Sequence, residues 1–259
     1  MAEFTSLRAF LDSHKTDSAI THTSMKGGKY FIPEDKLDQF YTLYVDAHND
    51  REYADFYLTE KPTTIGPLRV DLDFIYEGNV KDHKHTREQT TSFVKAYIET
   101  VSQYVEIPSN FDVYVMEKRK PTYEKKGDRT KSGIHLVVPG ICTHKLVEQS
   151  VRRTLVPRME DFFGGLPLKE SWEKIYDKGV VDRSVNWTLY MSKKNDKDDV
   201  TRPYEIQYSI RYDDGQFILN NQIPEVNVDL LKKLSMRQSD EVETCLLYTS
   251  PSPRDRQKS

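Results

Sequence analysis

The segment Leu68-Arg69-Val70-Asp71-Leu72-Asp73-Phe74-Ile75-Tyr76 decides the fold class of this chain. Apolar and charged side chains alternate through it with a period of two, which is the pattern of a strand with one buried face. Asp71 and Asp73 therefore point to the opposite face, about 6.6 Å apart. At an effective dielectric of about 20 their repulsion is roughly 2–3 kcal/mol, so a divalent cation is a natural partner. The alternative is a pair of solvated acids on a sheet surface.

The composition is that of a polar chain, with 259 residues, 31% charged side chains and a net charge of −3. No apolar run approaches a membrane span, and the N-terminus lacks the basic-then-apolar pattern of a secretion signal. Two cysteines are too few for a disulfide framework or a cysteine-rich zinc site, so we expect no zinc. A reducing compartment, cytoplasm or nucleus, fits best, without a membrane partner.

The last residues, 245–259, differ from the rest of the chain. Cys245-Leu246-Leu247-Tyr248-Thr249-Ser250-Pro251-Ser252-Pro253-Arg254-Asp255 resembles a translated sequencing adapter. We therefore expect one domain over residues 1–244, followed by a non-native tail that replaces the native continuation. A natural Ser/Pro-rich disordered tail is the alternative.

The order of expected elements indicates an α+β fold. Helical spacing over 4–11 and from Pro33 onward, with a short strand at 29–32, predicts a small N-terminal α/β layer. After the Asp71/Asp73 strand we expect a helix over 86–105, strands over 111–118 and 132–139, a helix over 144–163 bent at Pro157, and a strand over 185–192. This β-α-β-β-α-β order, over about residues 66–195, is that of an RRM-like core. A hairpin over Ile206 to Leu219 follows.

This topology makes the first and third strands central neighbours, and the fourth strand flanks the first. On the third strand, Lys131, Gly133 and His135 share one face, opposite the apolar residues. Asp182 stands just before the expected fourth strand. We therefore expect three carboxylates, a histidine and a lysine to converge on one open sheet face.

A basic segment links the second and third strands, with seven basic residues and three acidic ones between Glu117 and Lys131. A solvated loop and a loop that contacts phosphate are both compatible with this composition. The candidate nucleic-acid-binding residues are Lys118, Arg119, Lys120, Lys125, Lys126 and Arg129.

Taken together, these motifs resemble the archaeo-eukaryotic primase superfamily, in the branch of primase modules from large eukaryotic DNA viruses. The matching elements, within residues 25–220, are Asp71-x-Asp73, Lys131-Ser132-Gly133-Ile134-His135, Asp182-x-Ser184-Val185, Trp187, Tyr190-x-Ser192-Lys193-Lys194 and Pro203-Tyr204. The chain departs from the pattern where Val185 and Trp187 stand close together and where Met191 replaces a usual glycine.

The resemblance implies an archaeo-eukaryotic primase fold and a nucleotidyltransferase: a DNA primase or primase-polymerase that uses nucleoside triphosphates on single-stranded DNA. Asp71, Asp73 and Asp182 would hold two Mg²⁺ or Mn²⁺ ions, which clamp the attacking and leaving oxygens of an in-line displacement. The implied nucleotide-binding residues are His135, Lys131, Ser132, Lys193 and Lys194. The resemblance also implies a replication site in the cytoplasm or nucleus of an infected host cell, and a helicase domain beyond the C-terminal end.

Two other classes of function stay open. A metal-dependent nuclease could use Asp71 with Glu117 and Lys118, although neighbouring strand residues point to opposite faces. A catalytically inactive single-stranded nucleic-acid-binding module would need the basic segment without the acid cluster. The pair in His83-Lys84-His85 has the look of a metal-binding motif, but we interpret it as an exposed loop.

Overall fold

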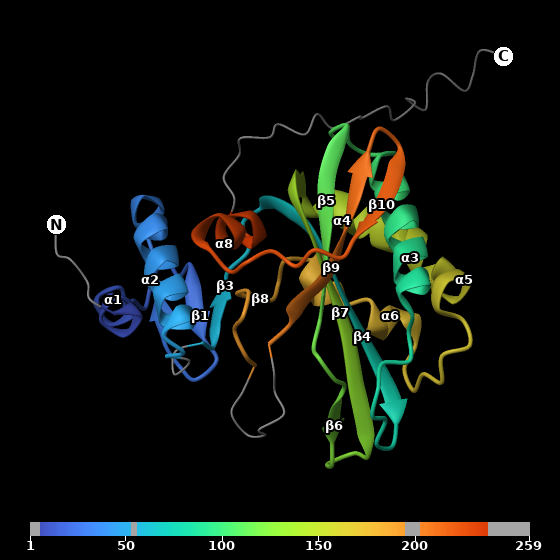
Figure 1. Cartoon of the computed structure of the whole chain (residues 1–259), viewed down its shortest axis with the longest axis horizontal. Helices are drawn as coiled ribbons and strands as arrows, with labels where there is room; N and C mark the ends of the chain where they lie inside the picture. Colours follow the sequence, from blue (N-terminus) through green and yellow to red (C-terminus); the bar gives the residue numbers. More distant parts are fainter. Residues whose placement is uncertain (1–5, 53–55, 195–202, 238–259) are drawn as a thin grey trace.

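Figure 1 shows the computed structural model, which describes residues 6–52, 56–194 and 203–237. Two sheets form its framework: a four-stranded sheet in the order β2-β1-β3-β8, and a six-stranded sheet in the order β10-β9-β5-β7-β4 with β6 paired to β7. The strands of the small sheet are β1 (His22–Ser24), β2 (Lys29–Tyr30), β3 (Leu58–Glu60) and β8 (Trp187–Thr188). The strands of the large sheet are β4 (Ile65–Glu77), β5 (Asn110–Glu117), β6 (Thr122–Glu124), β7 (Arg129–His144), β9 (Glu205–Asp213) and β10 (Gln216–Asn220).

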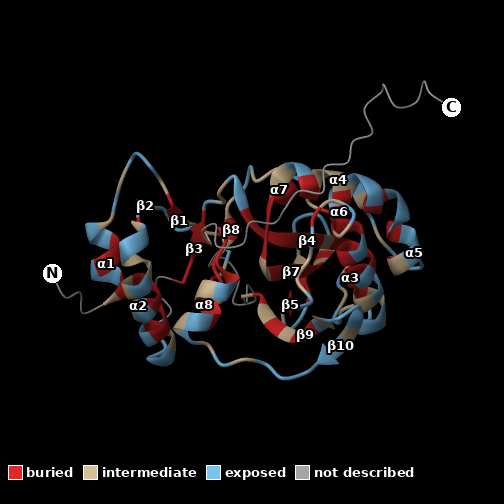
Figure 2. Ribbon diagram, turned by 90° about the horizontal axis from the view of Figure 1, so that it is seen from above, coloured by how far each residue is buried: buried red, intermediate tan, exposed pale blue. Residues whose placement is uncertain are grey.

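The helices divide between the two sheets. Figure 2 shows α1 and α2 with the small sheet at one end, and α3 to α6 grouped with the large sheet at the other. The helices are α1 (Leu7–Ser13), η1 (Glu34–Lys36), α2 (Leu37–Asn49), α3 (Arg87–Val101), α4 (Lys145–Leu155), η3 (Val156–Arg158), α5 (Met159–Phe163), α6 (Trp172–Ile175), α7 (Lys178–Val181) and α8 (Val228–Leu234). The α+β class is confirmed.

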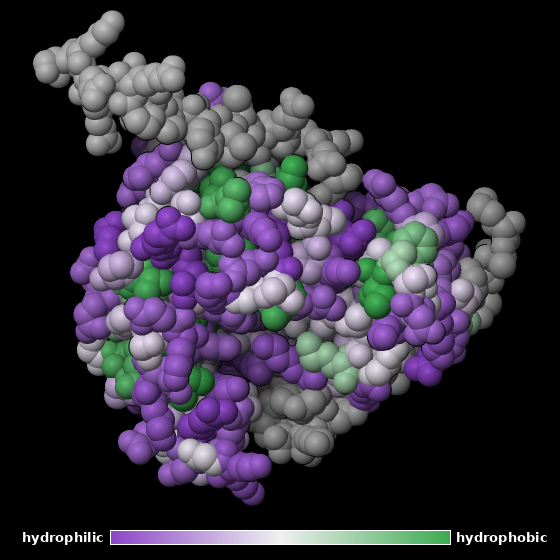
Figure 3. Space-filling view, turned by 180° about the vertical axis from the view of Figure 1, so that it is seen from behind, coloured by the Kyte–Doolittle hydropathy of each residue, from purple (hydrophilic) through white to green (hydrophobic). Residues whose placement is uncertain are grey.

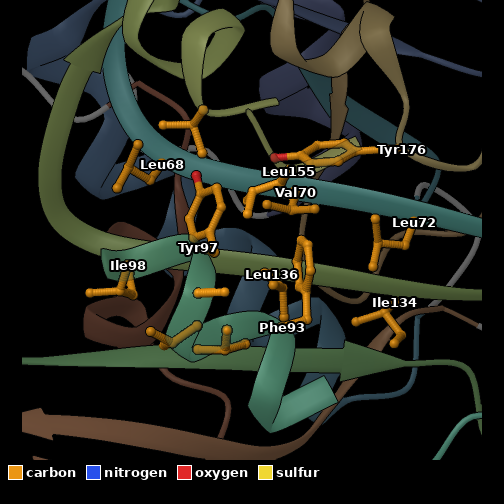
Figure 4. Packing of buried hydrophobic residues seen from close by; sticks show 14 of the residues in the cluster. Leu68, Val70, Leu72, Phe93, Tyr97, Ile98, Ile134, Leu136, Leu155 and Tyr176 are labelled. Carbon is orange, nitrogen blue, oxygen red and sulfur yellow. The ribbon is translucent and has the colours of Figure 1, made fainter. Parts of the chain in front are cut away.

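Helix α3 illustrates how local sequence builds the main core. It begins at a capping box in which Thr86 and Gln89 each satisfy the other's backbone N–H. Its apolar stripe, including Phe93 and Tyr97, packs on the large sheet between Val70 and Leu136 in Figure 4. The next predicted helix is interrupted as expected, because Pro157 lacks an N–H and the chain passes through η3 before α5.

Strands β4 and β7 are antiparallel neighbours, as the expected topology requires, with register from Ile65↔His144 to Glu77↔Arg129. Even-numbered residues such as Leu72 and Ile134 enter the helix-covered core, so the odd-numbered residues face the other way. That second face is not open. The N-terminal layer and α8 form a second core cluster against its Tyr114, Met116 and Val137.

The prediction of a fourth strand at residues 185–192 was wrong. Only Trp187–Thr188 is extended, and this strand pairs with β3 of the small sheet. The place beside β4 is taken by residues 168–177, which make antiparallel bridges from Leu168 to Tyr76 and from Tyr176 to Leu72. Alternation identifies an edge strand but not which sheet receives it, so the sequence pattern fits either position.

The surface seen in Figure 3 is largely hydrophilic, with separate hydrophobic patches. Across the part of the chain that the structure describes, no helix combines the length and apolarity needed to cross a bilayer. The expected tail at 245–259, with Cys245, lies outside the described residues.

Helix α4 provides a matched test of the core, because Leu155 is fully buried whereas Leu146 is 60% exposed. We expect Leu155→Ala to lower the free energy of unfolding by about 2–5 kcal/mol through lost burial and a residual cavity. Leu146→Ala should change it by about 0.5 kcal/mol or less. Urea unfolding measures both, and equal losses would contradict the packing of α4 on the sheet.

Candidate active site

The site begins with the pairing of Asp71 and His135 across β4 and β7. His135 Nε2 lies 3.5 Å from Asp71 Oδ2, and the two residues are only 4% and 5% exposed. Asp71 Oδ1 and His135 Nε2 are buried without a hydrogen-bond partner among the described residues. Asp73 follows two positions along β4, opposite Gly133, and is partly exposed. The structure thus brings the two aspartates and the histidine together.

The pKa values of the two carboxyl groups shift in opposite directions. Burial acts to raise the pKa of Asp71, but the interactions with His135, then Lys194 and Lys118, outweigh it and hold that pKa below its ordinary value. The pKa of Asp73 is raised, first by the charge of Asp71 and then by burial. Two buried acids this close disfavour full ionisation unless a cation joins them.

Two aromatic rings fix the imidazole in place. Tyr204 stacks on His135 with ring centroids 3.5 Å apart and an interplanar angle of 10°, and the Trp187 ring lies 4.6 Å away. Burial, followed by the charges of Asp71 and Asp73, raises the pKa of Tyr204 well above its ordinary range, so its phenol stays protonated. Trp187 and Tyr204 both belong to the motifs that carry the resemblance, and the structure places both rings against His135.

Gly133 is the small residue that this packing requires. A Cβ added there would lie 2.2 Å from Tyr204 Oη and 3.2 Å from Asp73 Oδ1. Glycine therefore lets the tyrosine ring cover the strand beside the carboxylates.

Three lysines surround the acids from separate segments. Lys118 is half-buried and lies with Nζ 5.4 Å from the Tyr204 ring centroid. Burial, then the charge of Lys194, lowers the pKa of Lys118. Lys131 pairs with Glu124 at 3.1 Å and acts electrostatically on Asp73.

Ser132 is not part of this group. As an even-numbered residue of β7 it faces the helix layer, where its Oγ lies 2.7 Å from His83 Nδ1. Lys193 hydrogen-bonds through its backbone N–H to the Phe56 carbonyl. With Arg119, Lys193 lines a separate cavity of about 590 Å³.

The structure does not bring Asp182 to the other two aspartates. It follows α7, and its carboxylate accepts hydrogen bonds from Lys178 and from Gln149 Nε2 of α4, the latter at 2.7 Å. The next residue, Arg183, inserts its guanidinium among the carbonyls of Thr63, Gly66 and Thr143. That anchor turns Asp182 toward the helix layer.

Asp177 lies next to β4, at the height of Asp71. Its backbone N–H donates to the Asp71 carbonyl at 3.0 Å, next to the Leu72–Tyr176 bridge. By the register of that bridge Asp177 stands opposite Asp71, and its Oδ1 accepts a hydrogen bond from the Gly179 N–H at 2.6 Å. The sequence contains the apolar-apolar-Asp pattern twice, in Ile175-Tyr176-Asp177 and Val180-Val181-Asp182, and only the second was considered.

The basic segment divides into parts with different surroundings. Arg119 pairs with Glu205 at 3.0 Å, and Arg129 pairs with Glu124 at 2.7 Å. The exposed lysines of the segment are Lys120, Lys125 and Lys126.

Two sequence-based interpretations of neighbouring residues need correction. The nuclease alternative placed Glu117 with Asp71, but Glu117 lies on the helix side, 3.4 Å from His85 Nε2. His83 and His85 are not an exposed loop, since His85 is buried and His83 is hydrogen-bonded at both ring nitrogens. Local polarity suggested exposure, whereas contact with Phe74 and the sheet buries His85.

The chain is similar to known proteins over most of its length. Residues 21–210 match the family model described as the C962R protein N-terminal AEP domain, where AEP stands for archaeo-eukaryotic primase. Over 210 residues the chain is 29% identical to "Putative helicase L207/L206" of Acanthamoeba polyphaga mimivirus. The match covers 77% of this chain and 21% of that protein, so the chain spans about a fifth of its relative's length.

The charge conflict at the aspartates predicts opposite stability effects for two substitutions. Because folding raises the pKa of Asp73, the unfolded chain ionises first and stability falls as the pH rises through that interval. Without divalent cations, Asp73→Asn should therefore stabilise the protein near neutral pH, and the gain should disappear below the ordinary carboxylate pKa of about 3.9.

Asp182→Asn is the matched control. In the natural protein, the hydrogen bond from Lys178 is the main cause that lowers the pKa of Asp182. Ionised Asp182 therefore stabilises the fold at pH values above the ordinary carboxyl pKa. Asp182→Asn should thus lose stability where Asp73→Asn gains it. Thermal unfolding across the acidic range measures both, and a loss for Asp73→Asn at neutral pH would contradict the proposed repulsion.

Proposed function

Because the chain belongs to the archaeo-eukaryotic primases, in the family of the C962R protein N-terminal AEP domain, we propose that it synthesises primers from nucleoside triphosphates on single-stranded DNA. The observation that carries this proposal is the juxtaposition of Asp71, Asp73 and His135 in one half-closed site. A nucleic-acid-binding module without catalysis would have no use for two carboxylates whose mutual repulsion raises the pKa of Asp73.

The carboxylates fit a pair of Mg²⁺ or Mn²⁺ ions. Asp71 Oδ1 is buried without a partner, and Asp73 carries a charge that its surroundings disfavour, so both offer oxygens for a hard cation. Asp71 and Asp73 would hold both ions, and Asp177 would supply the third carboxylate in place of Asp182. When bound, the ions stabilise the attacking and leaving oxygens of nucleotidyl transfer.

The remaining residues of the site would position the nucleotide. His135 is held by Tyr204 and Trp187 in a fixed orientation, with Nε2 free of other hydrogen bonds, so it can donate to a triphosphate oxygen. Lys118, Lys131 and Lys194 supply positive charge around the acids, which offsets the charge of an incoming triphosphate. The three lysines act as point charges and require no defined base.

The template would be held by residues further from the acids. Lys120, Lys125 and Lys126 are exposed near the β6–β7 hairpin, and Arg119 and Lys193 line the neighbouring cavity. Contacts of this kind bind phosphate without reading sequence. Arg129 is neutralised by Glu124 and would contribute less.

A helicase domain in the same polypeptide is the proposed partner. The mimivirus relative is named as a helicase, and this chain matches 21% of its length. Primer synthesis beside a helicase would act at a viral replication site in the cytoplasm or nucleus of an infected cell.

We expect Asp71→Ala, Asp73→Ala and Asp177→Asn each to lower primer synthesis by about a hundredfold or more, since each removes a metal-binding oxygen. Asn keeps the N-cap that Asp177 provides to Gly179, so α7 should persist. The matched control, Asp182→Asn, should retain synthesis. The measurement is extension of labelled nucleotides on single-stranded DNA with Mg²⁺ or Mn²⁺.

The same assay separates the alternatives. Shortening of the template would indicate a nuclease, and a gel shift without products would indicate a binding module. Loss of synthesis in Asp182→Asn with retention in Asp177→Asn would overturn the assignment of the third carboxylate.

His135→Ala should weaken nucleotide binding at least tenfold and leave template affinity within about twofold. The reason is that the proposed contact of His135 is with the triphosphate of the nucleotide and not with the template. Fluorescence titrations with a labelled nucleotide and a labelled oligonucleotide measure the two affinities. Equal losses in both would count against a triphosphate contact.

A further inference from the structure

A second group of ligand-type side chains lies on the opposite face of the large sheet. One ligand atom from each of His83, His85 and Glu117 lies within 4.8 Å of the others. We propose that these three residues bind a Zn²⁺ ion that fastens the segment between β4 and α3 to the C-terminal end of β5. This site is independent of the proposed primase chemistry.

The separations fit a tetrahedral ion. Bonds of about 2.0–2.1 Å set the ligand atoms roughly 3.3 Å apart. His85 Nε2 is 3.4 Å from Glu117 Oε1, and His83 Nε2 is 4.0 Å from Glu117 Oε2. To complete the geometry, His83, whose side chain is 20% exposed, must turn its Nε2 away from the Lys118 carbonyl, which lies 2.8 Å from it, and toward Glu117.

The buried imidazole of His85 is the feature that indicates a bound ligand. Its side chain is 2% exposed, and neither ring nitrogen has a hydrogen-bond partner among the described residues. A buried imidazole without partners carries a desolvation cost that a bound metal would offset. The ring also packs 5.1 Å from Phe74, which holds it in place on the sheet.

Metal-binding histidines usually make a hydrogen bond through the ring nitrogen that does not bind the metal. His83 already has such a partner for Nδ1 in the Ser132 hydroxyl. The Nε2–H of His83 donates to the Lys118 carbonyl at 2.8 Å, and the Ser132 hydroxyl donates to Nδ1 at 2.7 Å. With zinc bound, the proton would move to Nδ1 and donate to Ser132 Oγ, which frees the Nε2 lone pair for the ion. This gives Ser132 a role as a positioning residue.

The ligand set selects the metal. Two imidazoles and one carboxylate suit Zn²⁺, whereas Mg²⁺ and Ca²⁺ prefer oxygen ligands alone. Glu117 is 13% exposed, so a water molecule can take the fourth position. Counting cysteines could not detect this site, because it contains none.

The test is zinc uptake by the whole chain after treatment with a chelator. We expect one equivalent of Zn²⁺, measured by competition with a chromophoric chelator, and a rise of several degrees in the melting temperature. His85→Ala and Glu117→Gln should each weaken binding at least tenfold, and Ser132→Ala should weaken it by about 10–100-fold.

Two controls separate this site from others. His14→Ala, a histidine of the N-terminal layer, and Asp71→Asn, in the candidate active site, should both keep zinc affinity within about twofold. If His85→Ala fails to fold, as judged by circular dichroism, Ser132→Ala and Glu117→Gln decide the question. No zinc uptake by the natural protein, or uptake unchanged in both of these variants, would overturn the proposal.

Discussion

The antiparallel pairing of β4 with β7 is the constraint on which the rest of the structure depends. It sets Asp71 opposite His135 and Asp73 opposite Gly133, while Leu72 and its even-numbered neighbours enter the main core. A slip of one residue would exchange the two faces, moving the charged set into the helix-covered core and the apolar set to the side of the N-terminal layer. Packing of the apolar residues in the helix-covered core therefore fixes the register of β4 and β7. That register in turn fixes which residues meet in the candidate active site.

Because side chains alternate along a strand, polar residues of different kinds lie on the two faces of the large sheet. Gly133 and His135 face the N-terminal layer with the aspartates, whereas Ser132, just before Gly133, points to the opposite face and contacts His83. The two candidate metal sites are separated by the thickness of a strand and differ in ligand chemistry. Oxygen-only ligands suit Mg²⁺ or Mn²⁺ on one face, and imidazoles suit zinc on the other.

The candidate active site is built at a cost in stability. The charge of Asp71 and burial raise the pKa of Asp73, and the nearby Lys194, His135 and Lys131 do not fully offset them. Stacking of Tyr204 on His135 keeps the group assembled in the absence of a ligand. Buried charge held in advance of a reaction is the arrangement expected where electrostatic stabilisation does the chemistry.

The sequence by itself determined the faces of the strands and the family. Alternation around Asp71 and Asp73, and around His135, predicted their common face, and the motif resemblance to archaeo-eukaryotic primases is confirmed. Both Asp177 and Asp182 follow two apolar residues, and only the tertiary structure shows that the Asp177 N–H meets Asp71 of β4 whereas the Asp182 carboxylate binds Gln149 of helix α4. Periodicity reports the direction of a side chain within its own strand, whereas neighbours across an edge are set by long-range packing.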